Sequence, residues 1–379
     1  MGDNRNRGTR DLPSKGMPRR DFLRAAGLTA FGLATGAVAL NGCSRPVKTS
    51  LKNWAWIPAR QVPSLDDWKR LFEKMRYNGV TGALVHGKPD EIFKLVPVAR
   101  DTGVDLHHWI ITLRCTDDQV KQDHPDWFMI NRKGVSCLDK PPYIPGYTWL
   151  CPSREEVVEY LEKRVAGLAE LQGLAGIHLD YIRYPDVILP VGLQPKYNLV
   201  QDKEYPEFDF CYCDVCRAKF KKETGLDPLK LPDPSANQAW RQYRYRQVTD
   251  LVNRLVKVAH GKDKQLTAAV FPSPSIARRL VRQDWPSWNL DSFHPMMYHK
   301  YYNEDVPWIG EVTKEGVQAL AGKAPLYSGV LIKMLTPAEL AEATKLAVQN
   351  GAGGVTLFTA TYMTDDHWKA LRHALEEIG

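Results

Sequence analysis

The sequence lacks several features that mark common functional classes. No Gly-x-Gly-x-x-Gly run or phosphate-binding loop follows any expected strand, which argues against a nucleotide cofactor. No basic patch interleaved with aromatic residues is present, so nucleic-acid binding is not expected. The N-terminal apolar run, residues 25–40, is shorter than the roughly 20 residues that a membrane-spanning helix needs. These absences predict a globular protein without a nucleotide or nucleic-acid partner.

The net charge of +7 is concentrated at the N-terminus. The first 43 residues hold seven Lys or Arg and three Asp or Glu, which leaves 44 basic against 41 acidic residues, or +3, for the rest. Much of the excess charge therefore belongs to a targeting segment. With 379 residues, 44% of them hydrophobic, the chain is long enough for a large packed core.

The N-terminal segment is predicted to be an export signal. Arg19 and Arg20, followed by the apolar run, are typical of a twin-arginine signal. Residues 40–43, Leu-Asn-Gly-Cys, resemble a lipobox, in which cleavage leaves Cys43 as a lipid-modified N-terminus; the alternative is a plain export signal with an incidental Cys43. We expect residues 1–43 to be the signal, 44–50 a tether and 51–379 the folded body. The protein is then exported to the periplasm or cell surface and anchored to the membrane through Cys43.

Strand and helix patterns alternate along residues 51–379. The expected strands are 52–56, 80–85, 104–113, 176–180, 266–271, 291–299, 326–331 and 353–358. Eight strands alternating with helices predict a single (β/α)8 TIM barrel of the α/β class rather than a doubly wound sheet. Two long irregular stretches, 114–152 and 186–236, are expected insertions after strands three and four on the catalytic face.

The most informative stretch is Gly176–Pro185. Alternation places Gly176, His178 and Asp180 on one side of the fourth strand. Asp180 stands where the strand ends, and the carboxyl ends of parallel strands carry the active site in barrels of this kind. Asp180 is therefore a candidate catalytic residue, and the alternative is an Asp that caps the next turn.

Aromatic and polar residues at the other strand ends are expected to bind substrate. Aromatic planes stack on the C–H faces of sugars, while polar groups bind their hydroxyls. Taken singly, each aromatic residue is more often part of a core; their common position at strand ends favours a carbohydrate site. The predicted substrate-binding residues are Trp54, Trp56, His86, Trp109, Tyr181, Arg183, Trp285, Tyr298, His299 and Phe358.

Glycoside cleavage normally needs a second carboxylate beside the acid. Asp284 is the expected catalytic partner of Asp180, because the loop after the fifth strand opens onto the same face. The alternative is a reaction assisted by an acetamido group of the substrate, with Tyr298 as the positioning residue.

Two segments carry a family resemblance. Residues 149–157, WLCPSREEV, leading to residues 176–185, GIHLDYIRYP, resemble the glycosyl-hydrolase-like family numbered ten, bacterial barrel proteins that are often lipoproteins. The resemblance implies a (β/α)8 barrel that acts on extracytoplasmic polysaccharide or descends from such enzymes, with Asp180 as the acidic strand-four residue. Cys151 departs from the Asn that is usual before that Pro. His299 stands where the similar Met-x-Tyr-Asp pattern of chitinases has Asp.

Three cysteines lie close together in Cys211-Tyr212-Cys213-Asp214-Val215-Cys216. Three thiols at this spacing suit a tetrahedral metal and are similar to the structural zinc cluster of some barrel β-galactosidases. The fourth ligand would come from Cys115, Cys137 or Cys151, and three disulfides are an equal alternative in an oxidising compartment. Either arrangement is expected to be structural, because no open ligand set of His and carboxylate accompanies the cluster.

The sequence thus predicts an exported glycoside hydrolase that cleaves O-glycosidic bonds of an envelope or extracellular polysaccharide. Asp180 is the predicted general acid, and no cofactor is expected for catalysis. Peptidoglycan glycan strands are the nearest polymer for such a protein. The alternative is a barrel lipoprotein that binds glycan without cleaving it.

Overall fold

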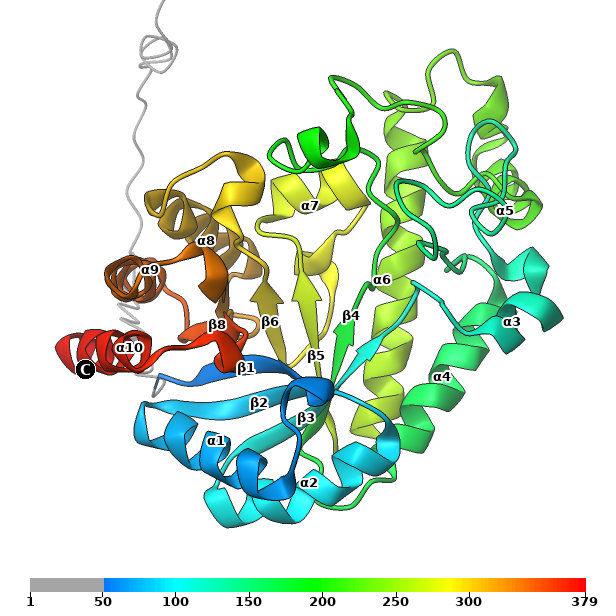
Figure 1. Cartoon of the computed structure of the whole chain (residues 1–379). Helices are drawn as coiled ribbons and strands as arrows, with labels where there is room; N and C mark the ends of the chain where they lie inside the picture. The colour runs from blue at the N-terminus through cyan, green and yellow to red at the C-terminus, as the bar shows by residue number, and fades with distance from the viewer. Residues whose placement is uncertain (1–50) are drawn as a thin grey trace, which may run out of the picture. The chain divides into compact units, whose positions relative to one another are not determined.

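A computed structural model of the chain describes residues 51–379, so the predicted export signal and Cys43 lie outside the described residues. Within them, eight parallel strands form a nearly closed barrel with helices around it (Figure 1). The strand order is β6-β5-β4-β3-β2-β1-β8-β7. Two parallel bridges, Phe293 with Leu326 and Met296 with Gly329, bring β6 beside β7. The predicted single (β/α)8 TIM barrel is confirmed.

The elements follow the predicted alternation closely. The strands are β1 (Asn53–Pro58), β2 (Val80–His86), β3 (Asp105–Ile111), β4 (Gly176–Asp180), β5 (Gln265–Val270), β6 (Ser292–Pro295), β7 (Ser328–Leu331) and β8 (Val355–Phe358). The helices are α1 (Leu65–Tyr77), α2 (Pro89–Thr102), α3 (Asp118–Asp123), α4 (Glu155–Ala169), α5 (Asp214–Thr224), α6 (Gln238–His260), α7 (Pro274–Val281), α8 (Pro307–Leu320), α9 (Pro337–Gln349) and α10 (Asp365–Ile378). The short helices α3, α5 and α7 were not predicted from the sequence. None of the helices within residues 51–379 combines the length and apolarity needed to cross a bilayer.

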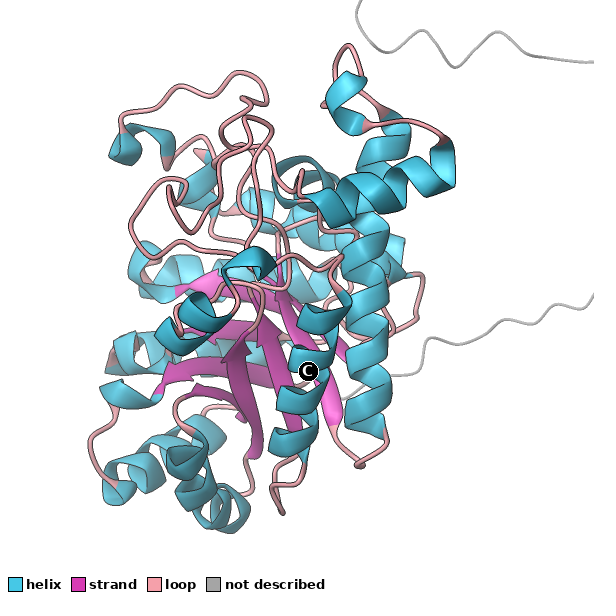
Figure 2. Cartoon of the chain, turned by 90° about the vertical axis from the view of Figure 1, so that its right-hand side faces the viewer, coloured by secondary structure: helices cyan, strands magenta, loops and turns pink. Residues whose placement is uncertain are grey.

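Several of the outer helices combine an apolar face with a capped start. In α1, Trp68, Phe72 and Met75 are buried on one face, and the Ser64 side chain accepts a hydrogen bond from the backbone N–H of Asp67. Helix α9 begins with a capping box formed by Thr336 and Glu339. These faces cover the outside of the strands, as Figure 2 shows for the helices that surround the sheet.

The barrel interior is filled by large rings that pack against glycines. A Cβ atom at Gly82 would lie 2.1 Å from the ring of Trp54, and one at Gly329 would lie 2.7 Å from the ring of Trp56. Trp56 Nε1 donates to His178 Nε2 at 2.9 Å, and His178 Nδ1 pairs with Thr267 Oγ1 at 2.8 Å. Burial lowers the pKa of His178 well below its usual value. His178 is therefore a neutral, hydrogen-bonded core histidine that fixes Trp56.

The two predicted insertions lie after β3 and β4, and loops gather above one end of the strands in Figure 2. A buried ionic cluster ties the second insertion to the barrel. Asp209 accepts a hydrogen bond from Arg244 of α6 at 2.5 Å and another from Tyr212 at 2.5 Å. Arg282, at the end of α7, is also fully buried and pairs with Glu204 of the same insertion. Buried charges are tolerated when they are paired in this way, so the insertion is a fixed wall of the barrel mouth.

Candidate active site

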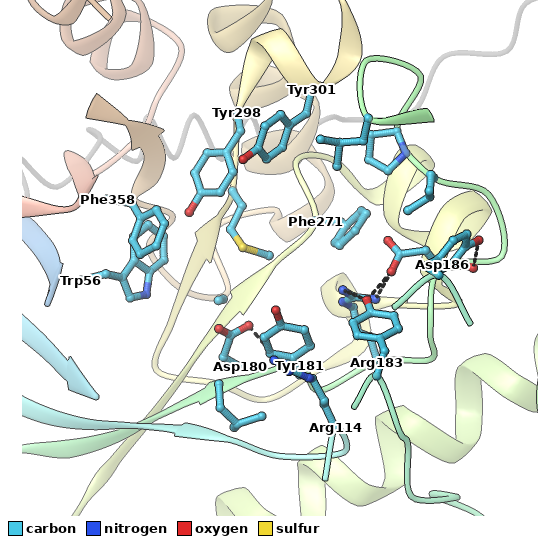
Figure 3. Close-up of a pocket in the computed structure, with 18 of the residues that line it drawn as sticks. Trp56, Arg114, Asp180, Tyr181, Arg183, Asp186, Phe271, Tyr298, Tyr301 and Phe358 are labelled. Carbon is cyan, nitrogen blue, oxygen red and sulfur yellow. Dashed lines mark hydrogen bonds and ion pairs between the residues drawn. The ribbon is translucent and has the colours of Figure 1, made fainter. Parts of the chain in front are cut away.

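A cavity of about 500 Å³ opens where the strands end, and Figure 3 shows the side chains that line it. Strands β1, β2, β3, β4, β5, β6 and β8 contribute residues at or near their C-terminal ends, and both insertions contribute further parts of the wall. Eight predicted site residues line it: Trp56, His86, Trp109, Asp180, Tyr181, Arg183, Tyr298 and Phe358. The cavity therefore occupies the place where TIM barrels hold their active sites.

Asp180 is the last residue of β4, and only 7% of it is exposed. Its Oδ2 accepts a hydrogen bond from Trp109 Nε1 at 3.1 Å, and its Oδ1 accepts one from the backbone N–H of Tyr181 at 2.7 Å. Burial raises the pKa of Asp180, although these hydrogen bonds and the charge of Arg183 oppose the shift. No ion pair joins Asp180 to a cation within residues 51–379. Asp180 thus has the environment of a carboxylic acid that can give up a proton to a buried substrate.

The chain turns sharply after Asp180. Tyr181 has a φ of 53°, a left-handed conformation that is rare for a bulky residue. The hydroxyl and backbone N–H of Thr112 hold the Asp180 carbonyl at 2.6 and 2.9 Å. This turn places Tyr181 beside Asp180 in the cavity wall (Figure 3).

A second carboxylate in the cavity, Asp186, was not predicted. Its Oδ2 accepts hydrogen bonds from Tyr147 Oη at 2.5 Å and Arg183 Nη1 at 3.2 Å. Arg183 also donates to Tyr147 Oη at 3.1 Å, so the three side chains form a closed buried cluster. The ion pair with Asp186 holds the pKa of Arg183 above its usual value despite burial. Asp186 is therefore compensated by Arg183, and Asp180 is the carboxylate without a cationic partner.

Aromatic rings form the wall opposite this cluster (Figure 3). Phe358 stacks on Tyr298 with ring centroids 5.9 Å apart, and it meets the edges of Trp56 and Trp109 at 6.2 and 6.1 Å. Burial, together with the nearby charge of Asp180, raises the pKa of the Tyr298 hydroxyl well above its usual value. That hydroxyl has no hydrogen-bond partner in the described part of the chain. It remains neutral and available to a ligand in the cavity.

Four predicted site residues do not line the cavity: Trp54, Trp285, His299 and Asp284. Trp54 is in the barrel interior, where its ring packs against His107 and His294. Trp285 packs against Phe293, and His299 is buried at the start of a 3-10 turn; neither lines the cavity.

The structure does not support the predicted catalytic pair of Asp180 and Asp284. Its carboxylate pairs with Arg278 at 2.6 Å and accepts a hydrogen bond from Ser287 at 2.8 Å, and it does not line the cavity. The reason is the unpredicted helix α7, which fills the loop after β5 and supplies Arg278. The structure does not bring Asp284 to Asp180.

About half of the cavity residues that were not predicted from the sequence lie on the insertions. The irregular stretch 114–152 was a predicted active-site loop, but nothing local in it distinguished Tyr143 or Tyr147. Asp186 stands directly after Pro185 and three residues after Arg183, with which it forms an ion pair. This spacing is the signal in the sequence that would have identified Asp186. The additional lining residues include Arg60, Arg114, Tyr143, Tyr147, Asp186, Phe271, Met296, Tyr301 and Tyr302.

The cysteine cluster forms a second, separate feature. Cys151 joins the predicted Cys211, Cys213 and Cys216, and the four sulfur atoms lie within 4.8 Å of one another. Cys151 Sγ is 3.4 Å from Cys216 Sγ and 3.8 Å from Cys213 Sγ, and the backbone N–H of Ile130 donates to Cys211 Sγ at 3.4 Å. The six cysteines within residues 51–379 are free thiols in this structure, and the alternative of three disulfides is not seen among them. Four buried thiols from two insertions converge at one point.

Comparisons with known proteins identify the class of fold. No protein-family model matches the chain, and no curated protein sequence matches it. The chain is similar in structure to the PgaB (BpsB) glycoside hydrolase domain from Bordetella bronchiseptica, with a TM-score of 0.63 and 11% identity over 86% of this chain and 99% of that domain. It is also similar to the catalytic domain of β-amylase from Paenibacillus polymyxa, with a TM-score of 0.58 and 11% identity over 87% of this chain and 99% of that one.

A third similar structure is a β-galactosidase from Bacillus circulans sp. alkalophilus, with a TM-score of 0.53 and 10% identity over 82% of this chain and 50% of that chain. At these identities the likeness concerns the fold. The chain therefore has the TIM-barrel fold of glycoside hydrolases, and the resemblance to family ten stays a prediction.

Proposed function

We propose that the protein is a glycoside hydrolase that cleaves O-glycosidic bonds of an envelope or extracellular polysaccharide, with Asp180 as general acid. The observation that carries the proposal is a buried Asp180 of raised pKa at the end of β4, in a cavity walled by aromatic rings. A protonated carboxyl can donate to the leaving glycosidic oxygen, while Trp56, Trp109 and Phe358 offer stacking faces to sugar rings. Peptidoglycan glycan strands are a candidate substrate.

The second chemical group of the reaction follows from the same geometry. Asp186 is already paired with Arg183 and Tyr147, so it is poorly suited to attack or to activate water. We favour assistance by an acetamido group of the substrate, with the neutral Tyr298 hydroxyl holding that group. The mechanism then needs a single strong acid.

Reducing-end release from a panel of glycans by the purified full-length protein tests this proposal. Release from at least one polysaccharide supports a hydrolase. Binding to a glycan without release supports the alternative, a barrel that holds glycan without cleaving it.

The pH dependence of cleavage follows from the raised pKa of Asp180. A raised pKa means that the carboxyl keeps its proton above the usual value of 3.8 and loses it as the pH rises through the higher value. Because the protonated form is the active acid, we expect kcat/KM to fall on the alkaline side of that pKa. A pH profile of kcat/KM measures this, and a rate that rises through the same window contradicts the acid role.

We also propose that Cys151, Cys211, Cys213 and Cys216 hold a structural zinc ion. Sulfur atoms bound to tetrahedral zinc at about 2.3 Å lie roughly 3.8 Å apart, which is close to the separations of Cys151 from its neighbours here. When bound, the ion would supply a fixed crosslink between the two insertions. No catalytic role is assigned to it, and no cofactor is proposed for the hydrolysis.

The proposed location rests on the N-terminal residues. We infer export by the twin-arginine route, from Arg19 and Arg20, and attachment to the membrane through a lipid on Cys43. An extracytoplasmic location brings the cavity to envelope polysaccharide.

A further inference from the structure

The charges that line the cavity do not balance. The lining includes three arginines, Arg60, Arg114 and Arg183, against two carboxylates, Asp180 and Asp186. Arg183 and Asp186 neutralise each other at 3.2 Å. Asp180 forms no ion pair with any of the three arginines. Within residues 51–379, the guanidinium groups of Arg60 and Arg114 therefore have no carboxylate partner in the cavity wall.

Arg114 is the better placed of the two. It follows β3 and lies beside Tyr181 (Figure 3). Its guanidinium is 5.2 Å from the ring centroid of Tyr181 and 5.8 Å from that of Tyr147. These contacts with two aromatic faces restrict where the guanidinium can lie. Arg60 is exposed and follows β1.

The donors of Arg114 are not satisfied by the protein. Its Nε is buried without a hydrogen-bond partner, and the described residues provide no ion pair or side-chain hydrogen bond to the guanidinium. Arg114 as a whole is only partly buried, and its terminal nitrogens are not among the fully buried atoms, so a ligand in the cavity can reach them. The two terminal nitrogens form a fork that matches the two oxygens of a carboxylate or a phosphate group.

We infer that the glycan bound in this cavity is acidic, and that Arg114 recognises its carboxylate or phosphate group. The inference rests on the proposed function and names the substrate class of the same site. A neutral sugar would leave the charge of Arg114 unpaired in a partly desolvated wall, whereas an acidic sugar pairs it. Arg114 is thus a specificity residue rather than part of the proton transfer.

Binding to matched pairs of oligosaccharides tests the inference. The full-length Asp180→Asn protein is titrated by calorimetry with oligogalacturonate and with lactyl-bearing amino-sugar oligomers, each beside its carboxyl-reduced neutral counterpart. A phosphorylated and a dephosphorylated maltooligosaccharide distinguish phosphate from carboxylate. We expect an acidic member to bind about 10- to 100-fold more tightly than its neutral counterpart.

Three variants separate recognition from structure. Arg114→Gln is expected to weaken binding of the acidic member far more than binding of the neutral member, and Arg114→Lys is expected to keep part of the preference. Arg279→Gln is the matched control, because Arg279 is an exposed arginine that does not line the cavity. The inference is overturned if the two members of every pair have equal Kd values, or if no pair binds at all. It is also overturned if Arg114→Gln weakens binding of the acidic and the neutral member by the same factor. The binding measurement involves no turnover. A wild-type protein that releases no reducing ends therefore contradicts the proposed hydrolysis, but it does not change the outcome of the binding test.

Discussion

The Asp180→Asn protein is expected to cleave glycan with a kcat about 10²- to 10⁴-fold below that of the wild type. An amide cannot protonate the leaving oxygen, so the loss reflects the missing acid. Initial rates of reducing-end release, at saturating substrate, measure the effect. The KM should change little, because the aromatic wall formed by Trp56, Trp109 and Phe358 is untouched.

Asp284→Asn is the matched control for this prediction. Asp284 is the carboxylate that the sequence also offered, and its pairing with Arg278 outside the cavity predicts a kcat near that of the wild type.

The Asp180→Asn substitution also removes one hydrogen bond. The amide that replaces the carboxylate has a single oxygen, which can take the place of only one of the two acceptors now used by Trp109 Nε1 and the backbone N–H of Tyr181. Losing one hydrogen bond costs about 1 kcal/mol, so a thermal melt is used to check that the variant remains folded. Undiminished cleavage by a folded Asp180→Asn protein removes Asp180 as the acid.

The Cys151→Ser protein is expected to lose one equivalent of zinc and to unfold at a lower temperature. Structural zinc contributes on the order of 10 kcal/mol when its four thiolates are in place, so removal of one ligand should cost several kcal/mol. For a chain of this size, such a change lowers Tm by roughly 5 °C or more. Elemental analysis of the purified protein and a thermal melt measure the two effects.

Cys115→Ser provides the control for the zinc prediction. Cys115 is also buried but lies outside the four-sulfur cluster, so its replacement should keep the metal. A wild-type protein that contains no metal, with a Tm that chelation leaves unchanged, contradicts the zinc proposal. Disulfides between these cysteines, found by mass spectrometry of the exported protein, contradict it as well.

The barrel and the position of Asp180 were predictable because their signals are local. Period-two alternation in Gly176–Asp180 is a property of successive side chains, and a carboxylate at the end of a buried parallel strand lies on the catalytic face of any such barrel. The same reasoning correctly placed Trp56, Trp109 and Phe358. It failed for Trp54. This residue comes two positions before Trp56 on β1, so its side chain also points into the barrel interior but lies deeper in the barrel than the cavity.

The remaining site depends on contacts between distant segments. Tyr147 meets Asp186 only because the two insertions pack together, and Cys151 completes the cluster of Cys211–Cys216 from the other insertion. Irregular segments have no periodicity that reveals such pairings. The choice of Asp284 failed for a different reason, since the eight-residue helix α7 was too short to stand out in the sequence and its Arg278 takes the carboxylate.

Cleavage in water labelled with heavy oxygen tests the central claim most directly. The wild-type protein is incubated with the polysaccharide that it binds, and the products are analysed by mass spectrometry. A glycoside hydrolase places one labelled oxygen in each new product pair, and the Asp180→Asn protein should form almost no labelled product. Products that carry no label, or none at all from any polysaccharide that the protein binds, contradict hydrolysis at the Asp180 cavity.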